Sequence, residues 1–120
     1  MPEQAAPIEI TQDKDVHVVE FTNNKILDEA NINEIKLALV HLIESNEKPR
    51  VLLDFGNVDH LSSAALGVLI DINNRIRQQN GMLRMACIKP QIMEVFQITK
   101  LDKLFRIFST RDQAMHSFKE

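Results

Sequence analysis

Five side chains that could do chemistry lie within one stretch of ten residues, namely Asp54, Asp59, His60, Ser62 and Ser63. A serine, a histidine and a carboxylate together suit a nucleophilic enzyme, provided that the histidine reaches the serine hydroxyl. His60 precedes Ser63 by only three residues on a short loop, which makes that geometry awkward. An enzyme with Ser63 as nucleophile, assisted by His60 and by Asp54 or Asp59, is therefore the least favoured hypothesis, and we expect no enzymatic activity.

The same stretch joins a predicted buried strand to a predicted helix. Residues 50–55 (RVLLDF) form a continuous apolar run between Pro49 and Gly56, which is typical of a central strand buried on both faces. After the serines, apolar residues recur at helical spacing, at Ala65, Val68, Leu69, Ile72 and Ile76. Ser62 or Ser63 suits the N-cap of this helix, because a serine hydroxyl can accept an otherwise unpaired backbone N–H.

This placement predicts a binding edge. In open α/β sheets, ligands and partners meet the carboxyl ends of the strands. A helix start adds free N–H groups and a positive dipole end, which favour an anionic group such as a phosphate. Asp54, at the predicted strand end, is expected either to accept backbone N–H bonds from the loop or to contact a partner. Asp59 and His60 are expected to be solvated loop residues.

The remaining pattern predicts a single α/β domain with the order β-β-α-β-α-β-α-β-α. Two short apolar–polar runs, at 8–11 and 16–21, predict an edge hairpin, and the pattern from about Asp28 to near Asn46 predicts the first helix. The later elements are predicted as a strand at 82–88, a helix from Pro90 to near Thr99, a strand at 104–108 and a terminal helix opened by a capping box at 110–113. Gly81 is predicted to stop the serine-bearing helix by adopting a left-handed conformation. Alternating strands and helices imply parallel pairing, so we expect a small mixed sheet.

Composition and charge exclude several classes of function. The 120 residues suit one domain, with residues 1–7 as a flexible N-terminus. A net charge of −3 with scattered basic residues argues against nucleic-acid binding. No apolar run approaches the about 18 residues of a membrane span, and the N-terminus lacks a signal-peptide pattern. We therefore expect a cytoplasmic protein with no membrane span.

Metal and cofactor sites are not predicted. The four histidines lie on separate predicted elements without metal-ligand spacing, at positions 17, 41, 60 and 116. Neither a glycine-rich nucleotide motif nor a GxSxG nucleophile motif is present. The single cysteine, Cys87, cannot form an internal disulfide, which fits a reducing compartment. Cys87 is predicted to be a small core residue in a buried strand.

Two motifs carry a resemblance to a known family. The segments VLLDFGNV at 51–58 and LSSAALGVL at 61–69 resemble the signature of the STAS domain, and more narrowly that of the bacterial anti-sigma factor antagonists. That signature is an apolar strand ending in Asp, a short loop, and Asp-Ser-Ser/Thr-Gly-Leu-Gly at the start of a helix. The segment FQITKLDKLF at 96–105 and the order of elements are also similar to the family. The resemblance covers nearly the whole chain and implies a STAS domain at 8–120.

Carried over by position, the resemblance implies a role for each serine. Leu66 and Gly67 match the Leu-Gly of the family, which places Ser63 on the serine that an anti-sigma factor kinase phosphorylates. Ser62 stands where the family usually has Asp, and serves as a cap or as a second phosphorylation site. Two alanines follow where the family has Ser or Thr and then Gly. The implied partner-binding surface consists of Asp54, Asp59, His60, Leu61, Ser62, Ser63, Ala64, Leu66 and Gly67.

The function that the resemblance implies is that of an anti-sigma factor antagonist. The unphosphorylated protein would bind an anti-sigma factor serine kinase and so free the sigma factor, and phosphorylation would end the binding. A PP2C-type phosphatase is a further candidate partner, no cofactor is implied, and we expect a monomer or a weak dimer. The alternative, raised by the replaced Asp and Gly, is a constitutive STAS scaffold or a regulatory subunit of a sensory or lipid-transport complex.

Overall fold

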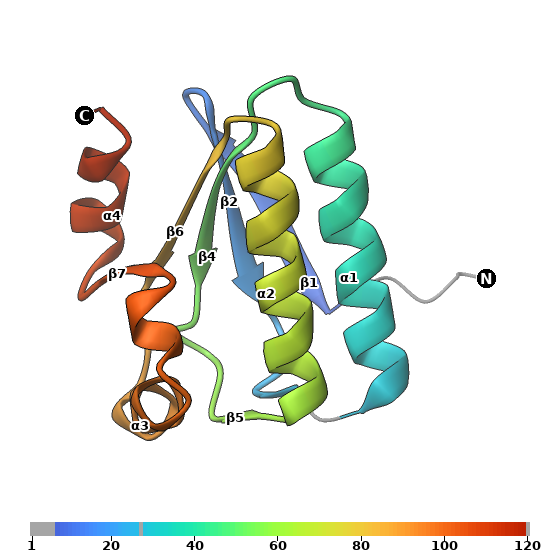
Figure 1. The fold of residues 1–120 in the computed structure, drawn as a ribbon, viewed down its shortest axis with the longest axis vertical. Coiled ribbons are helices and arrows are strands. Elements are labelled where there is room, and N and C mark those ends of the chain that lie inside the picture. The colour runs from blue at the N-terminus through green and yellow to red at the C-terminus, as the bar shows by residue number, and fades with distance from the viewer. Residues whose placement is uncertain (1–6, 27, 120) are drawn as a thin grey trace.

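A five-stranded mixed sheet forms the centre of the molecule (Figure 1). The computed structural model describes residues 7–26 and 28–119, so the N-terminus predicted to be flexible lies, except for Pro7, outside the described residues. The strands are β1 (Ile8–Asp13), β2 (Val16–Phe21), β4 (Arg50–Asp54), β6 (Met82–Ala86) and β7 (Arg106–Phe108), in the spatial order β1-β2-β4-β6-β7. β1 runs antiparallel to β2, and the other neighbours are parallel. The predicted edge hairpin and the mixed sheet are confirmed.

Helices cover both faces of this sheet. α1 (Glu29–Glu44) and α2 (Ser63–Gln78) lie side by side on one face, and α4 (Arg111–Ser117) lies on the other (Figure 1). α3 (Pro90–Ile98) and the 3₁₀ turn η1 (Leu101–Lys103) connect β6 to β7 near the carboxyl ends of the strands. The predicted α/β class is confirmed. None of the described helices is long and apolar enough to cross a membrane.

Two short strands do not follow from the sequence pattern. β3 (Lys25–Ile26) and β5 (His60–Leu61) pair in parallel as a separate ribbon. Each contains only two residues, too few to show the alternation that identifies a strand. The ribbon matters for the candidate site because β5 ends immediately before Ser62, the residue that precedes the first residue of α2.

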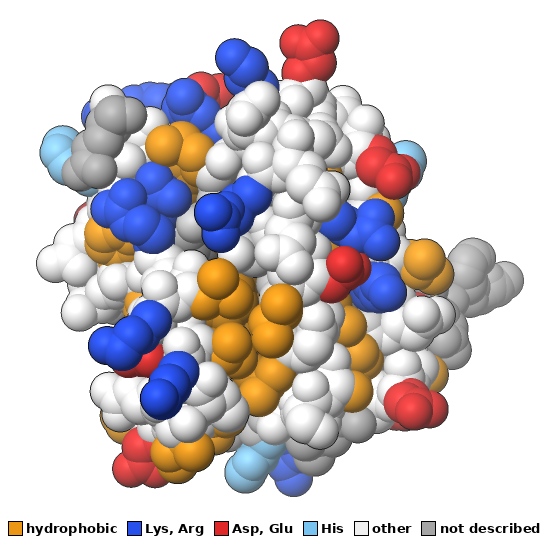
Figure 2. Space-filling view, viewed as in Figure 1, with side chains coloured by type: hydrophobic (Ala, Val, Ile, Leu, Met, Phe, Trp, Pro, Cys, Tyr) orange, Lys and Arg blue, Asp and Glu red, His pale blue; other side chains and the backbone are white. Residues whose placement is uncertain are grey.

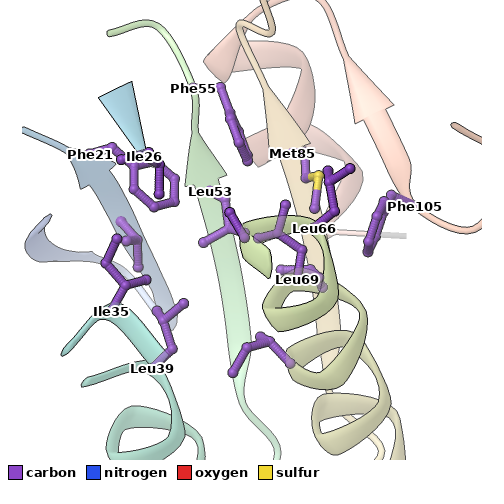
Figure 3. Close-up of a cluster of buried hydrophobic side chains, with 14 of the residues drawn as sticks. Phe21, Ile26, Ile35, Leu39, Leu53, Phe55, Leu66, Leu69, Met85 and Phe105 are labelled. Carbon is purple, nitrogen blue, oxygen red and sulfur yellow. The ribbon is translucent and has the colours of Figure 1, made fainter. Parts of the chain in front are cut away.

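The two faces of the sheet have separate hydrophobic cores. β4 contributes to both, because Val51 and Leu53 pack with α1 and α2 whereas Leu52 packs with α4. Figure 3 shows part of the larger core, to which strands, helices, the loop after β4 and the segment before β7 contribute the labelled side chains Phe21, Ile26, Ile35, Leu39, Leu53, Phe55, Leu66, Leu69, Met85 and Phe105. Burial of β4 on both faces explains its continuous apolar sequence.

The predicted helix starts are confirmed at atomic detail. The Asp28 side chain caps α1, and Pro90 is the first residue of α3. Thr110 Oγ1 accepts the N–H of Gln113 (3.1 Å) at the start of α4. The second bond of this capping box departs from the expected pattern, because Gln113 Oε1 accepts the N–H of Ser109 (3.2 Å), one residue before the cap.

Two predictions about single residues were wrong. The left-handed residue after α2 is Asn80 (φ 60), whereas Gly81 has no positive φ. Gly81 is needed for another reason, since a Cβ at this position would lie 2.2 Å from the carbonyl oxygen of Pro49. Cys87 lies beyond the end of β6, half-buried and with φ 64, and is therefore not a residue of a buried strand.

Candidate functional site

Strand β4 ends in Asp54, whose two carboxylate oxygens bind different partners. Oδ1 accepts the backbone N–H of Gly56 (2.8 Å). Oδ2 accepts two bonds from Arg111, one from Nε (3.1 Å) and one from Nη2 (2.6 Å). Only 12% of the Asp54 side chain is exposed, so solvent screens this pair weakly. The predicted bonding of Asp54 to the loop backbone is confirmed, and its contact with a partner stays a prediction.

Arg111, the first residue of α4, belongs to this region although the sequence pattern did not reveal it. Its Nη2 also donates to Glu20 Oε2 (2.6 Å), so one guanidinium joins α4 to both β2 and β4. The hydrogen bonds to Asp54 are the main cause that raises the pKa of Arg111, and Glu20 adds to the effect. The two acids are 57 and 91 residues away in the sequence, so no local motif marks this arginine.

The loop after Asp54 is anchored to the strands on either side of β4. Phe55 is fully buried, and its N–H donates to the carbonyl oxygen of Ala86 in β6 (3.0 Å). Asn57 Nδ2 donates to the carbonyl oxygen of Phe21 in β2 (3.1 Å). Because these bonds hold the loop on two sides, the path from β4 to α2 is fixed by the sheet itself.

Asp59 continues this anchoring. Its carboxylate forms an ion pair with Lys89, the residue that precedes α3, and accepts a bond from Asn24 Nδ2 (3.2 Å). The hydrogen bond from Lys89 is the main cause that lowers the pKa of Asp59. Asp59 lies in the loop before β5 and is part-exposed, as predicted, and these contacts, which the sequence pattern did not reveal, tie it to two other segments. His60 is exposed, as predicted, but it belongs to β5 and not to a loop.

The components of a nucleophilic enzyme are present but not assembled. Asp54 and Asp59 direct their carboxylates to basic residues. Within the described part of the chain, His60 makes no hydrogen bond to Ser63 or to either acid. A catalytic serine needs a base within hydrogen-bond reach and a third group that orients the base. The arrangement supplies neither to Ser63.

Ser62 is the N-cap of α2. Its backbone is extended (φ −87, ψ 167), and its Oγ accepts the N–H of Ala65 (3.2 Å). The N–H of Ser62 donates to the carbonyl oxygen of Ile26 in β3 (3.1 Å). The hydroxyl and the backbone N–H of this half-buried residue therefore both make hydrogen bonds inside the molecule. The predicted role of Ser62 as a helix cap is confirmed.

Ser63 is in the opposite situation. It is the first residue of α2, it is exposed, and its hydroxyl makes no hydrogen bond to any residue that the structure describes. The first turn of this 16-residue helix holds no acidic residue. A negative charge on Ser63 would therefore meet the positive end of the helix dipole without an acidic neighbour in that turn.

The predicted partner-binding residues differ in how far they can reach a partner. His60, Ser63, Ala64 and Gly67 are exposed, whereas Asp54, Asp59, Leu61 and Ser62 are half-buried and Leu66 packs in the core (Figure 3). A Cβ added at Gly67 would meet nothing within 4 Å, so packing does not require glycine there. The exposed members on α2 form a surface of small side chains beside Ser63.

Other chemistry in this region is limited. Burial, together with the charge of Asp54, raises the pKa of the Cys87 thiol, which keeps it protonated at neutral pH and a poor nucleophile. Among residues 7–26 and 28–119, no three or more His, Cys, Asp or Glu side chains are grouped so that they could hold a metal ion.

Comparison with known proteins identifies the family. The model of the STAS domain family matches residues 7–114. A Bordetella bronchiseptica protein named "Putative anti-sigma factor antagonist BtrV" is 32% identical over 94 residues, which span 78% of this chain and 80% of that protein.

Solved structures share the fold. An anti-sigma-factor antagonist (STAS) domain protein from Planctomyces limnophilus has a TM-score of 0.83 at 23% identity, covering 95% of this chain and 98% of that chain. The Bacillus cell fate determinant SpoIIAA in its phosphorylated form has a TM-score of 0.70 at 13% identity, covering 92% and 98%. With the family model matched along most of its length and a relative above 30% identity, this chain belongs to the STAS domain family.

Proposed function

We propose that this protein is an anti-sigma factor antagonist whose unphosphorylated form binds an anti-sigma factor kinase through the start of α2, and that phosphorylation of Ser63 ends the binding. The observation that carries the proposal is that the two serine hydroxyls have different structural roles. Ser62 holds the helix cap, whereas the Ser63 hydroxyl is exposed and unbonded among the described residues. A kinase can therefore modify the Ser63 hydroxyl without breaking a hydrogen bond to any described residue.

The physical effect of that modification is local. A phosphate adds about −1.5 to −2 charges at neutral pH. At the first position of α2 the helix dipole favours this charge, so the domain stays folded and gains a little stability. A partner that covers the same helix start meets a bulky dianion and must leave it without a counter-charge, which disfavours docking. The switch therefore acts on the interface and leaves the fold unchanged.

The surface around Ser63 is suited to a partner that recognises a rigid shape. The preceding loop is anchored through Asp54, Asn57 and Asp59, whose partners outside the loop lie on four different segments. Ala64 and Gly67 present little side chain, so a partner can approach the backbone of α2 closely. A preformed surface loses little conformational entropy on binding, which favours affinity.

Replacement of the Asp usual in the family by Ser62 leaves the cap intact. Ser and Asp are both strong N-cap residues because each accepts an N–H of the first turn, and Ser62 does so from Ala65. What this chain lacks is the negative charge next to the phosphorylated serine. We therefore propose a kinase that recognises the shape of the loop and helix start more than an acidic neighbour. In this proposal, phosphorylation of Ser63 takes place in the cytoplasm, and a PP2C-type phosphatase removes the phosphate.

Phosphorylation and binding assays with the anti-sigma factor kinases encoded in the same genome test the proposal. With ATP, mass spectrometry should place the phosphate on Ser63 in the wild type and in Ser62→Ala, and Ser63→Ala should receive none. Unphosphorylated wild type and Ser63→Ala should bind the kinase, and Ser63→Asp should not. If neither serine is phosphorylated and Ser63→Asp binds as well as the wild type, the switch is wrong and the constitutive STAS subunit takes its place. Phosphate on Ser62 alone would contradict the assignment to Ser63.

A further inference from the structure

A second site lies at the other end of α2. A cavity of about 210 Å³ opens between the C-terminal half of α2, the start of β6 and the segment that leads from η1 into β7. Its lining includes one amide and three guanidinium side chains, those of Asn73, Arg77, Arg84 and Arg106. In Figure 2, lysine and arginine side chains gather over this part of the molecule, beside the upper end of α2. We propose that this cavity binds a phosphate group, either as the free ion or as the phosphomonoester of a small molecule.

Asn73 gives the first argument for a ligand. The residue is 6% exposed, and its amide nitrogen Nδ2 is buried with no hydrogen-bond partner among the described residues. A buried N–H group without an acceptor costs free energy, and native structures rarely contain one. Both hydrogens of this amide are donors, so the group that would satisfy it is an acceptor. The cavity that Asn73 lines is where such an acceptor can lie.

Charge gives the second argument. Arg77 follows Asn73 by one helical turn, so both side chains project on the same side of α2. The Arg77 side chain is exposed and makes no hydrogen bond or ion pair to the residues that the structure describes. Arg84, which is 6% exposed, is fixed by bonds from Nε to Ser117 Oγ (3.0 Å) and from Nη1 to the Leu83 carbonyl oxygen (3.2 Å). Arg106 lies at the cavity from the other side, its guanidinium 5.6 Å from the centre of the Phe108 ring.

The charged side chains that line the cavity are thus all basic. No Asp or Glu of the described chain lines the cavity, although the whole protein carries a net charge of −3. An amide nitrogen and guanidinium groups are donors, and guanidinium pairs strongly with phosphate oxygens in a bidentate manner. A water molecule occupies about 30 Å³ in the liquid, so the cavity has room for a phosphate and for part of the molecule that carries it.

This site is distinct from the proposed switch. Ser63 and Asn73 are ten residues apart on α2, which corresponds to about 15 Å along the helix axis. A phosphate on Ser63 therefore cannot occupy the cavity of the same molecule. The inference holds whether or not Ser63 is phosphorylated, and its failure would leave the proposed function untouched.

Titration of the full chain followed by ¹⁵N NMR tests the site. Inorganic phosphate, added at constant ionic strength against chloride, should shift the side-chain amide signals of Asn73 in a saturable way, and acetate should not. Arg77→Gln should weaken the phosphate affinity about tenfold, because it removes one charge-assisted hydrogen bond. Arg75→Gln is the matched control, since it removes the same charge from the same helix outside the cavity lining. Its affinity should stay within about twofold of the wild type.

The outcomes separate the sources of the phosphate group. Saturable binding of glycerol 3-phosphate in addition to inorganic phosphate supports a phosphomonoester ligand, and binding of inorganic phosphate alone supports the free ion. Unmoved Asn73 amide signals would overturn the proposal, as would an equal loss of affinity in Arg75→Gln and Arg77→Gln, which indicates general charge screening. Asn73→Leu should abolish phosphate binding. If that variant does not fold, the Asn73 amide signals of the wild type and the phosphate affinities of Arg75→Gln and Arg77→Gln test the proposal.

Discussion

Arg111 Nη2 lies 2.6 Å from Asp54 Oδ2. The first residue of α4 therefore binds the last residue of β4, immediately before the loop that leads to Ser62 and Ser63. The same nitrogen reaches Glu20 on β2 at 2.6 Å. Asp54 in turn accepts the N–H of Gly56. Through one guanidinium, α4 on one face of the sheet stabilises the loop that leads to α2 on the other face.

Replacing Arg111 should therefore destabilise the domain and loosen the loop. Arg111→Gln loses the charge-assisted bonds to Asp54 and Glu20 and leaves Asp54, which is 12% exposed, without its cation. We expect a loss of about 1–2 kcal/mol in the free energy of unfolding, measured by urea denaturation. Arg75→Gln is the control, because its bond to Asp71 is a half-exposed pair within one helix and should be worth less than about 0.5 kcal/mol. Equal losses in the two variants would contradict the anchoring role of Arg111.

The two adjacent serines should respond differently to removal of the hydroxyl. Ser62→Ala loses the N-cap bond to Ala65 and should lower the free energy of unfolding by about 1 kcal/mol. Ser63→Ala removes a hydroxyl that bonds to no described residue and should change the stability by less than about 0.5 kcal/mol. Thermal unfolding of both variants under one condition checks the difference. A larger loss for Ser63→Ala would show that the helix begins one residue later in solution.

Two glycines make a matched pair for alanine substitution. Gly81→Ala should destabilise the protein by about 2 kcal/mol or more, because its Cβ would lie 2.2 Å from the carbonyl oxygen of Pro49 and the backbone must move. Gly67→Ala places its Cβ in open space within α2 and should stabilise the protein by about 0.5–1 kcal/mol through helix propensity. Chemical denaturation of both variants measures the two effects. Kinase binding of Gly67→Ala can be measured as well, and a loss of affinity would indicate that Gly67 lies in the interface.

The pair between Asp59 and Lys89 predicts a specific response to pH. Lys89 lowers the pKa of Asp59 in the folded state below its ordinary value of 3.8. The pair therefore stabilises the loop above that ordinary value, and its contribution disappears as the pH falls through the lowered folded-state pKa. An NMR titration of the Asp59 carboxyl group should give a midpoint below 3.8 in the wild type.

Lys89→Met should raise the titration midpoint of Asp59 towards its ordinary pKa, because the hydrogen bond from Lys89 is the main cause of the lowered pKa. Lys103→Met removes a lysine that does not contribute to the pKa of Asp59 and should leave the midpoint where it was. An unchanged midpoint in Lys89→Met would mean that the ion pair does not persist in solution.

Features that depend on neighbouring residues in the chain were predictable. The apolar run of β4, the start of α1 near Asp28, Pro90 at the first position of α3 and the Thr110 cap are all present in the structure. Each follows from local sterics or from a hydrogen bond that spans a few residues. The same local physics led to the wrong residue at the end of α2, because Asn80 also tolerates the left-handed conformation that was assigned to Gly81.

Features that join distant segments were not predictable from one sequence. The bonds of Arg111 to Asp54 and Glu20 span 57 and 91 residues, and the pair of Lys89 with Asp59 spans 30. Basic and acidic residues are common on any surface, so their types and positions do not reveal which of them meet. The unsatisfied amide of Asn73 was hidden for the same reason, because its burial depends on β6 and on the segment before β7.

For the two serines, the sequence by itself determined that they lie between a buried strand and a helix, because hydrophobic periodicity is local to the chain. Which serine caps the helix and which is free was decided by the tertiary structure. Ser62 is held in an extended conformation by its hydrogen bond to Ile26, which follows from the pairing of β3 with β5. The helix therefore begins at Ser63, and the Ser63 hydroxyl is left exposed.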